Sequence, residues 1–125
     1  MSKNKKNAED ARETTKQVPE EFQKVLKDFY KDILLVFPEM KYKLKDTTIE
    51  FLQGKNDGKI VFEHCLKIYP ERFFDILYQN VDIFTNEDIN TCFLPNIEFS
   101  NLWKEDISEN TRKTIWKYLQ LILFS

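Results

Sequence analysis

Apolar and polar positions alternate at helical spacing most clearly in residues 20–37. Pro19 suits the first turn of a helix, and the glutamates that follow it complement the positive end of the helix dipole. Lysine and aspartate take the opposite face, so an amphipathic helix is predicted. Pro38 ends it, because the residue before a proline is biased away from helical backbone. Its apolar positions are Phe22, Val25, Leu26, Phe29, Tyr30, Ile33, Leu34 and Phe37.

A second helix is predicted for residues 108–124. Ser108 is its expected N-cap, and Glu109 favours the first turn. From Tyr118 onward the segment is apolar around nearly the whole helix, interrupted only by Gln120. A helix that is apolar on every side must be enclosed by other elements. We therefore expect it to be the hub of the fold, or to fill a groove in another chain.

The segment between these helices contains shorter elements, one of them ambiguous. Residues 47–53 form either a short helix or the first strand of a hairpin over residues 48–63, with its turn at Gly54–Gly58. The helix is favoured, because the second apolar run continues unbroken to Tyr69 and is too long for a typical strand. The other expected elements are helices over residues 57–69, 70–78 and 85–92 and an apolar loop or helical turn over residues 97–103.

The pattern predicts an all-α fold, an irregular bundle of five or six helices that forms a single domain over residues 19–125. Two glycines and four prolines are too few for the corners of a sandwich or barrel. Residues 1–18 are polar and cannot bury enough surface to offset their ordering entropy, so a disordered tail is expected. The predicted core contains Phe22, Leu26, Phe29, Ile33, Phe74, Leu77, Ile115, Leu119 and Ile122.

Aromatic residues are unusually frequent, with eleven phenylalanines, five tyrosines and two tryptophans. This surplus indicates an aromatic contact surface beside the core, because large aromatic side chains are typical anchors of binding hot spots. The predicted partner-binding residues are Phe99, Leu102, Trp103, Leu121 and Phe124. The alternative, which the pattern favours for the first three, is that they cover one end of the core.

The net charge of −2 gives no global attraction to nucleic acid or to acidic membranes. The tail carries Lys3, Lys5 and Lys6, which could neutralise a few phosphates and give weak, salt-dependent binding. No aromatic residue is interleaved there to stack on bases. A nucleic-acid-associated accessory role for this tail is therefore the alternative function and not the favoured one.

Candidate chemistry is sparse. His64 is the only histidine, and it adjoins Cys65. Neighbouring residues on a helix point about 100° apart, so these two cannot readily share a hydrogen bond, while Cys92 could approach from elsewhere. One histidine and two separate cysteines fall short of a structural zinc pattern, and Gly54–Lys59 is one residue short of a phosphate-binding loop. We therefore predict no catalytic residue, no metal and no cofactor.

The sequence also bears on where the protein acts. No segment reaches the roughly 18–20 apolar residues of a membrane-spanning helix, and the first residues lack the apolar core of a signal peptide. Two cysteines allow at most one disulfide and no dense framework. We expect a cytoplasmic protein that does not span a membrane.

Three runs of sequence, Tyr69–Asn80, Phe93–Phe99 and Ile115–Phe124, resemble uncharacterised proteins encoded by giant viruses with large double-stranded DNA genomes. The resemblance implies a virus-encoded protein that acts in the host cytoplasm or is carried in a virion. It brings no assigned activity and no site residues. From the residues themselves we predict a non-enzymatic protein-interaction or assembly module, which binds a protein partner or a second copy of itself.

Overall fold

The computed structural model describes residues 17–125, which form six α-helices and three 3-10 helices (η) and contain no named strand. The predicted all-α class is therefore confirmed. In chain order the elements are α2 (Glu20–Val36), η1 (Pro38–Lys43), α3 (Asp46–Leu52), α4 (Lys59–Ile68), η2 (Pro70–Arg72), α5 (Phe73–Leu77), η3 (Val81–Phe84), α6 (Phe99–Lys104) and α7 (Glu109–Leu123). Residues 1–16, and with them most of the predicted tail, lie outside the described residues.

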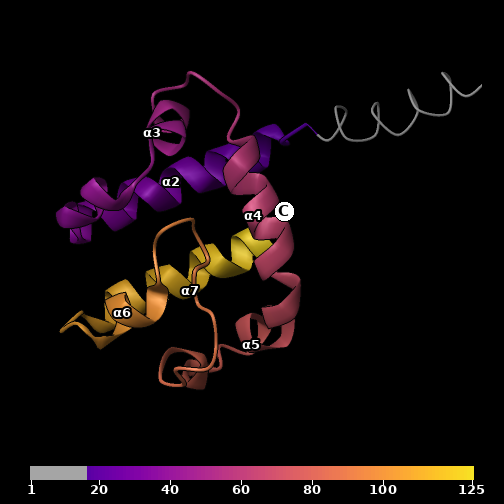
Figure 1. Cartoon of the computed structure of the whole chain (residues 1–125). Coiled ribbons are helices and arrows are strands. Elements are labelled where there is room, and N and C mark those ends of the chain that lie inside the picture. Colours follow the sequence, from indigo (N-terminus) through magenta and orange to yellow (C-terminus); the bar gives the residue numbers. More distant parts are fainter. Residues whose placement is uncertain (1–16) are drawn as a thin grey trace, which may run out of the picture.

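The two long helices form the centre of the bundle. α2 and α7 run antiparallel, side by side, and α4 crosses their shared end (Figure 1). The Phe29 ring on α2 stacks on Tyr118 of α7, with 4.8 Å between ring centroids. Tyr118 also donates a hydrogen bond of 2.6 Å to the Asp32 carboxylate. At the start of α2, the Phe22 ring packs edge to face against Phe62 on α4, with 4.9 Å between ring centroids. α2 therefore packs against both α4 and α7.

Residues 48–52 and 59–63 are helical, the connection between them contains no strand, and no hairpin forms, as the favoured alternative predicted. Gly54 stops α3 with a φ of 78°, and the Lys55 amide donates to the Glu50 carbonyl at 2.8 Å, the pattern of a left-handed helix cap. Gly58 precedes α4 with a φ of 77°. The Asn56 side chain accepts from the Gly58 amide at 2.8 Å. Two glycines at positive φ therefore build a tight corner between two helices.

The helix predicted over residues 85–92 is wrong. After η3 the chain runs as an irregular loop to α6. The Asn86 side chain accepts from the Asp88 amide, and the Asn90 side chain accepts from the Cys92 amide, each at 2.9 Å. Such local side-chain bonds satisfy the backbone without a helix. The loop then buries Phe93, Leu94 and Ile97, none more than 1% exposed, so part of the core is built from a segment without helical spacing.

Most of the predicted core is confirmed. Seven of the nine residues are at most 4% exposed, namely Phe22, Leu26, Phe29, Ile33, Ile115, Leu119 and Ile122. The prediction is wrong for Phe74, which is 67% exposed, and for Leu77, which is only half-buried. The reason is the length of α5: a five-residue helix offers one inward position, and Ile76 takes it with no exposed surface.

The boundary of the domain also shifts. Val18 was assigned to the polar tail, yet it is 4% exposed and belongs to the hydrophobic core. Its carbonyl accepts a hydrogen bond of 3.0 Å from the Gln23 side chain. A single apolar residue beside a proline carries no periodic signal, which is why the pattern missed it.

Candidate functional site

Three of the five residues predicted to bind a partner are core residues. Phe99, Leu102 and Trp103 are 0%, 1% and 8% exposed, so they lie in the core of this chain and offer little surface to a partner. The Trp103 ring stacks on Phe84 at 4.3 Å and meets the edge of Trp116 at 5.7 Å. A segment distant in sequence, η3, therefore covers the face of α6 that the sequence alone left open.

The other two predicted contact residues lie on the surface. Leu121 is 44% exposed and Phe124 is 63% exposed. Their spacing from Lys113 and Lys117, which are also exposed, places all four on one face of α7. The end of α7 is therefore enclosed on one side only, and its outer side presents apolar groups to solvent.

The short helix α5 adds exposed aromatic rings that sequence reasoning missed. Phe73, Phe74 and Tyr78 are 37%, 67% and 74% exposed. The rings of Phe73 and Phe74 meet edge to face at 5.1 Å, and Phe74 stacks on Tyr78 at 6.4 Å. The signal that could have revealed them was a run of adjacent apolar residues too short to form a helix with an inner and an outer face.

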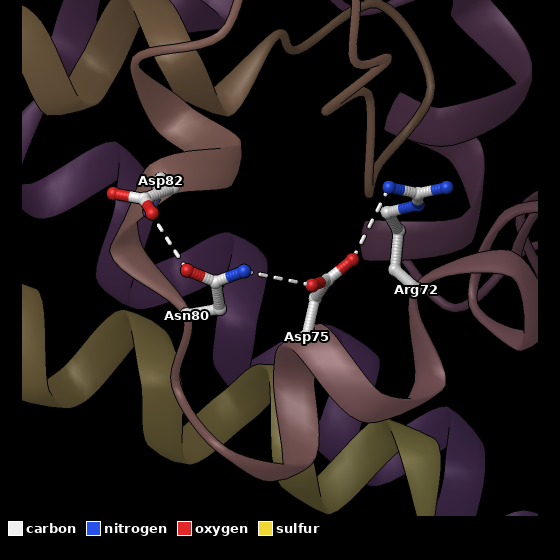
Figure 2. A network of polar contacts seen from close by, with 4 residues as sticks. All are labelled: Arg72, Asp75, Asn80 and Asp82. Atoms are coloured by element: carbon white, nitrogen blue, oxygen red, sulfur yellow. Dashed lines mark hydrogen bonds and ion pairs between the residues drawn. The ribbon is translucent and has the colours of Figure 1, made fainter.

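Polar contacts hold α5 in place, as Figure 2 shows. Arg72 donates to one oxygen of the Asp75 carboxylate at 3.2 Å, and the Asn80 side chain donates to the other at 2.9 Å. The Asn80 side chain in turn accepts from the backbone amide of Asp82 at 3.2 Å. This chain of contacts joins η2, α5 and η3, so the aromatic rings stand on a fixed support.

A contact from α7 closes the C-terminal end of the same helix. The Gln120 side chain donates to the carbonyls of Ile76 and Leu77, at 3.2 and 3.4 Å. These carbonyls lie in the last turn of α5, where the next helical turn is missing, and the Ile76 carbonyl also accepts from the Gln79 amide at 3.2 Å. Gln120 was the one polar interruption in the apolar run of α7, and its role is to join the end of α7 to α5.

α4, α5 and the end of α7 thus share one apolar surface, at the end of the molecule where Figure 1 places the C-terminus. A groove with a volume of about 210 Å³ lies among these helices. Its walls include Phe22, Phe62, Leu66, Phe73, Ile122 and Leu123. We name as the α5–α7 surface the six exposed apolar residues that α4, α5 and its C-cap, and the end of α7 carry: Leu66, Phe73, Phe74, Tyr78, Leu121 and Phe124. Leu66 and Phe73 also line the groove.

The residues with potential chemistry are His64, Cys65 and Cys92, of which Cys65 lines the groove. The Nε2 atom of His64 donates to the Cys92 carbonyl across 2.5 Å, so the two residues meet through the backbone and not through the thiol. Burial raises the pKa of the Cys65 thiol to about 12. Burial, and secondarily the nearby Glu98 carboxylate, raise the pKa of Cys92. Both thiols are thus held in the protonated form, which is a poor nucleophile.

The lysines of the predicted tail, a metal site and a membrane span are the remaining features considered in the sequence. Lys3, Lys5 and Lys6 lie outside the described residues. Within residues 17–125, no three His, Cys, Asp or Glu side chains are grouped so that they could hold a metal ion. None of the helices in that range is both long and apolar enough to cross a membrane. Comparison with protein-family models, curated proteins and solved structures finds no match, so the resemblance to giant-virus proteins stays a prediction.

The end of α5 offers a test of its support. Gln79 follows the helix with a φ of 52°, and the Asn80 amide donates to the Asp75 carbonyl at 2.8 Å. Left-handed backbone costs a non-glycine residue roughly 1–2 kcal/mol. Glycine avoids that cost but adds unfolded-chain entropy worth about 0.4–1 kcal/mol. Gln79→Gly should therefore raise the free energy of unfolding by about 0.5–1 kcal/mol, measured by urea denaturation.

The matched control is Gln53→Gly. Gln53 also follows a helix, but its φ is −86°, so glycine relieves no strain there. This variant should lower the free energy of unfolding by about 0.5–1 kcal/mol. If both substitutions lower the free energy of unfolding, the backbone after α5 is not strained.

Proposed function

We propose that this domain is a non-enzymatic protein-interaction module that binds its partner through the α5–α7 surface. The observation that carries the proposal is the exposure of its six apolar side chains, which are 37–74% accessible to solvent at one end of the molecule. Exposed apolar side chains gathered in one region are typical of contact sites in soluble proteins. Aromatic residues are enriched in such interfaces and in their hot spots.

The way the surface is held supports the proposal. The rings of Phe73, Phe74 and Tyr78 contact one another, and the helix that carries them is tied at both ends by Asp75 and Gln120. A partner that binds a surface already in place loses less conformational entropy than one that must order it. A groove beside protruding rings is also the arrangement in which an anchor side chain of a partner is buried.

As part of the same proposal, we place the protein in the cytoplasm. Cys65 and Cys92 are both free thiols, and the reducing conditions of the cytoplasm keep thiols in that state. Expression with a compartment marker would test this placement. Recovery of the chain from an oxidising compartment would contradict it.

The experiment for the function is affinity capture of the tagged full chain from its native cells, after nuclease treatment. The wild-type chain should retain a protein in stoichiometric amount. The double variant Phe74→Ser/Phe124→Ser should lose it, because it removes two large apolar side chains from the α5–α7 surface. Phe74 and Phe124 are 67% and 63% exposed, so their replacement should leave the core intact. Unchanged helical circular dichroism would show that the variant is folded.

The matched control removes two exposed apolar residues elsewhere. Leu35 and Tyr42 are 72% and 89% exposed on α2 and η1, and Leu35→Ser/Tyr42→Ser should retain the same protein. Retention by all three chains would overturn the α5–α7 surface as the contact site. Loss of the captured protein on nuclease treatment alone would instead favour the lysine-rich tail and nucleic acid.

A further inference from the structure

We infer that the partner at the α5–α7 surface is a second copy of this chain, bound about a two-fold axis. The inference rests on the proposed function, since it names the occupant of the same surface. Three properties of the described residues carry it: the area that is exposed, the presence of both rings and a groove, and the balance of charge around them.

The exposed area fits a small homodimer interface. An aromatic side chain can bury roughly 150–250 Å², and the fractions exposed at Phe73, Phe74, Tyr78 and Phe124 are 37–74%. Together with Leu66 and Leu121 the surface therefore offers on the order of 600 Å². Stable interfaces bury about 800 Å² on each partner, and those of homodimers are the more apolar. The α5–α7 surface supplies most of that area with apolar groups.

The shape of the surface is self-complementary. It contains protruding rings, of which Tyr78 and Phe74 are 74% and 67% exposed, and it contains the groove of about 210 Å³ lined by Leu66 and Phe73. In a two-fold dimer each copy uses the same patch, so the patch must carry both the projecting and the receiving element. A ring of one copy enters the groove of the other, and the reverse contact follows from the symmetry.

The charges around the surface point to a partner without a dominant charge. Lys67 adjoins Leu66 on α4, Glu71 lies in η2, and Lys117 stands one turn before Leu121 on α7. Both signs therefore flank the apolar centre, and Arg72 and Asp75 neutralise each other within it. A polyanion such as nucleic acid or an acidic membrane would need one sign of charge. A second copy carries the same mixture of charges and therefore brings no excess of one sign to the surface.

The test is sedimentation equilibrium of the full chain over micromolar to millimolar concentrations. The apparent mass should rise from the 15.1 kDa of the chain to twice that value. Because the surface lies at the small end of stable interfaces, the dissociation constant should be micromolar. Phe74→Ser/Phe124→Ser should remain monomeric throughout the range, while the control Leu35→Ser/Tyr42→Ser should dimerise as the wild type does.

A second variant tests the groove. Leu66 lines it and is 47% exposed, so Leu66→Glu should fold and should place a carboxylate in the dimer interface. An unpaired charge is costly to bury, and the dissociation constant should rise about tenfold or more. Raised ionic strength should change the wild-type constant little, since the central contacts are apolar.

The outcomes separate this inference from the function on which it rests. A wild-type chain that stays monomeric at millimolar concentration overturns the dimer, and capture of a different protein through Phe74 and Phe124 would then leave the proposed function intact. Dimers that form equally well in Phe74→Ser/Phe124→Ser also overturn the inference, because they must use another surface. A concentration-dependent dimer that is lost with Phe74 and Phe124 and weakened by Leu66→Glu supports it.

Discussion

Replacing Trp103 with alanine should lower the free energy of unfolding by about 3–5 kcal/mol, the range measured for large aromatic side chains removed from cores. Trp103 stacks on Phe84 at 4.3 Å and meets the edge of Trp116 at 5.7 Å. The Arg112 guanidinium lies 5.4 Å above its ring. The substitution removes all three contacts and leaves a cavity between α6, η3 and α7. Urea denaturation followed by circular dichroism measures the change.

The control for Trp103→Ala is Phe124→Ala. Phe124 is 63% exposed, and surface substitutions away from special features usually change stability by no more than about 0.5 kcal/mol. The pair thus compares a buried and an exposed member of the same predicted contact set. A stable Trp103→Ala domain that no longer binds its partner would contradict the structure, because it would return Trp103 to the interface.

Trp103 and Phe74 show why the site could not be predicted from the sequence alone. Trp103 follows Leu102 and precedes the charged residues Lys104 and Glu105, and a helix of six residues is too short for a periodic pattern. Its burial depends on Phe84, which lies far from it in sequence. The opposite error was made for Phe74, which was predicted to be buried because it lies in an apolar run. It faces outward from a five-residue helix. Non-local packing therefore decided the exposure of Trp103, and the short length of α5 decided that of Phe74.

The long helices were predictable because their signals are local. α2 spans 17 residues and α7 spans 15, which is enough for several repeats of the apolar pattern. Their limits also follow from single residues. Ser108 accepts a hydrogen bond of 3.1 Å from the Thr111 amide, as an N-cap does. Pro38 comes directly after Phe37, the C-cap of α2. The presence and limits of these two helices could therefore be derived from the sequence.

The connection to α6 was not predictable for a physical reason. Its asparagines, at positions 86, 90 and 96, can begin a helix, form a local turn or adopt left-handed backbone at similar cost. Asn86 and Asn90 form local turns, and Asn96 has a φ of 67° beside Pro95. The same loop carries Phe93 and Leu94, which are fully buried. Apolar spacing along the sequence does not predict the burial of residues in an irregular loop.

Replacing Gly58 with alanine should lower the free energy of unfolding by about 2–5 kcal/mol, for two reasons that add. The φ of Gly58 is 77°, and left-handed backbone costs an alanine roughly 1–2 kcal/mol. A Cβ atom at this position would also lie 2.6 Å from Cε1 of Phe51 and 2.7 Å from its Cδ1. Phe51 has no exposed surface, so its ring cannot move aside, and overpacking of this kind costs about 1–3 kcal/mol.

Gly54→Ala separates these two contributions. Gly54 has nearly the same φ, 78°, and a Cβ atom there would meet no heavy atom within 4 Å. Only the backbone cost of roughly 1–2 kcal/mol applies to it. The loss of unfolded-chain entropy is the same in both glycine-to-alanine changes, so it cancels in their difference. The two free energies of unfolding, measured in urea, should therefore differ by the packing cost against Phe51, about 1–3 kcal/mol. Equal values would mean that the corner between α3 and α4 opens without disturbing the core, and that Phe51 is not fixed where the structure places it.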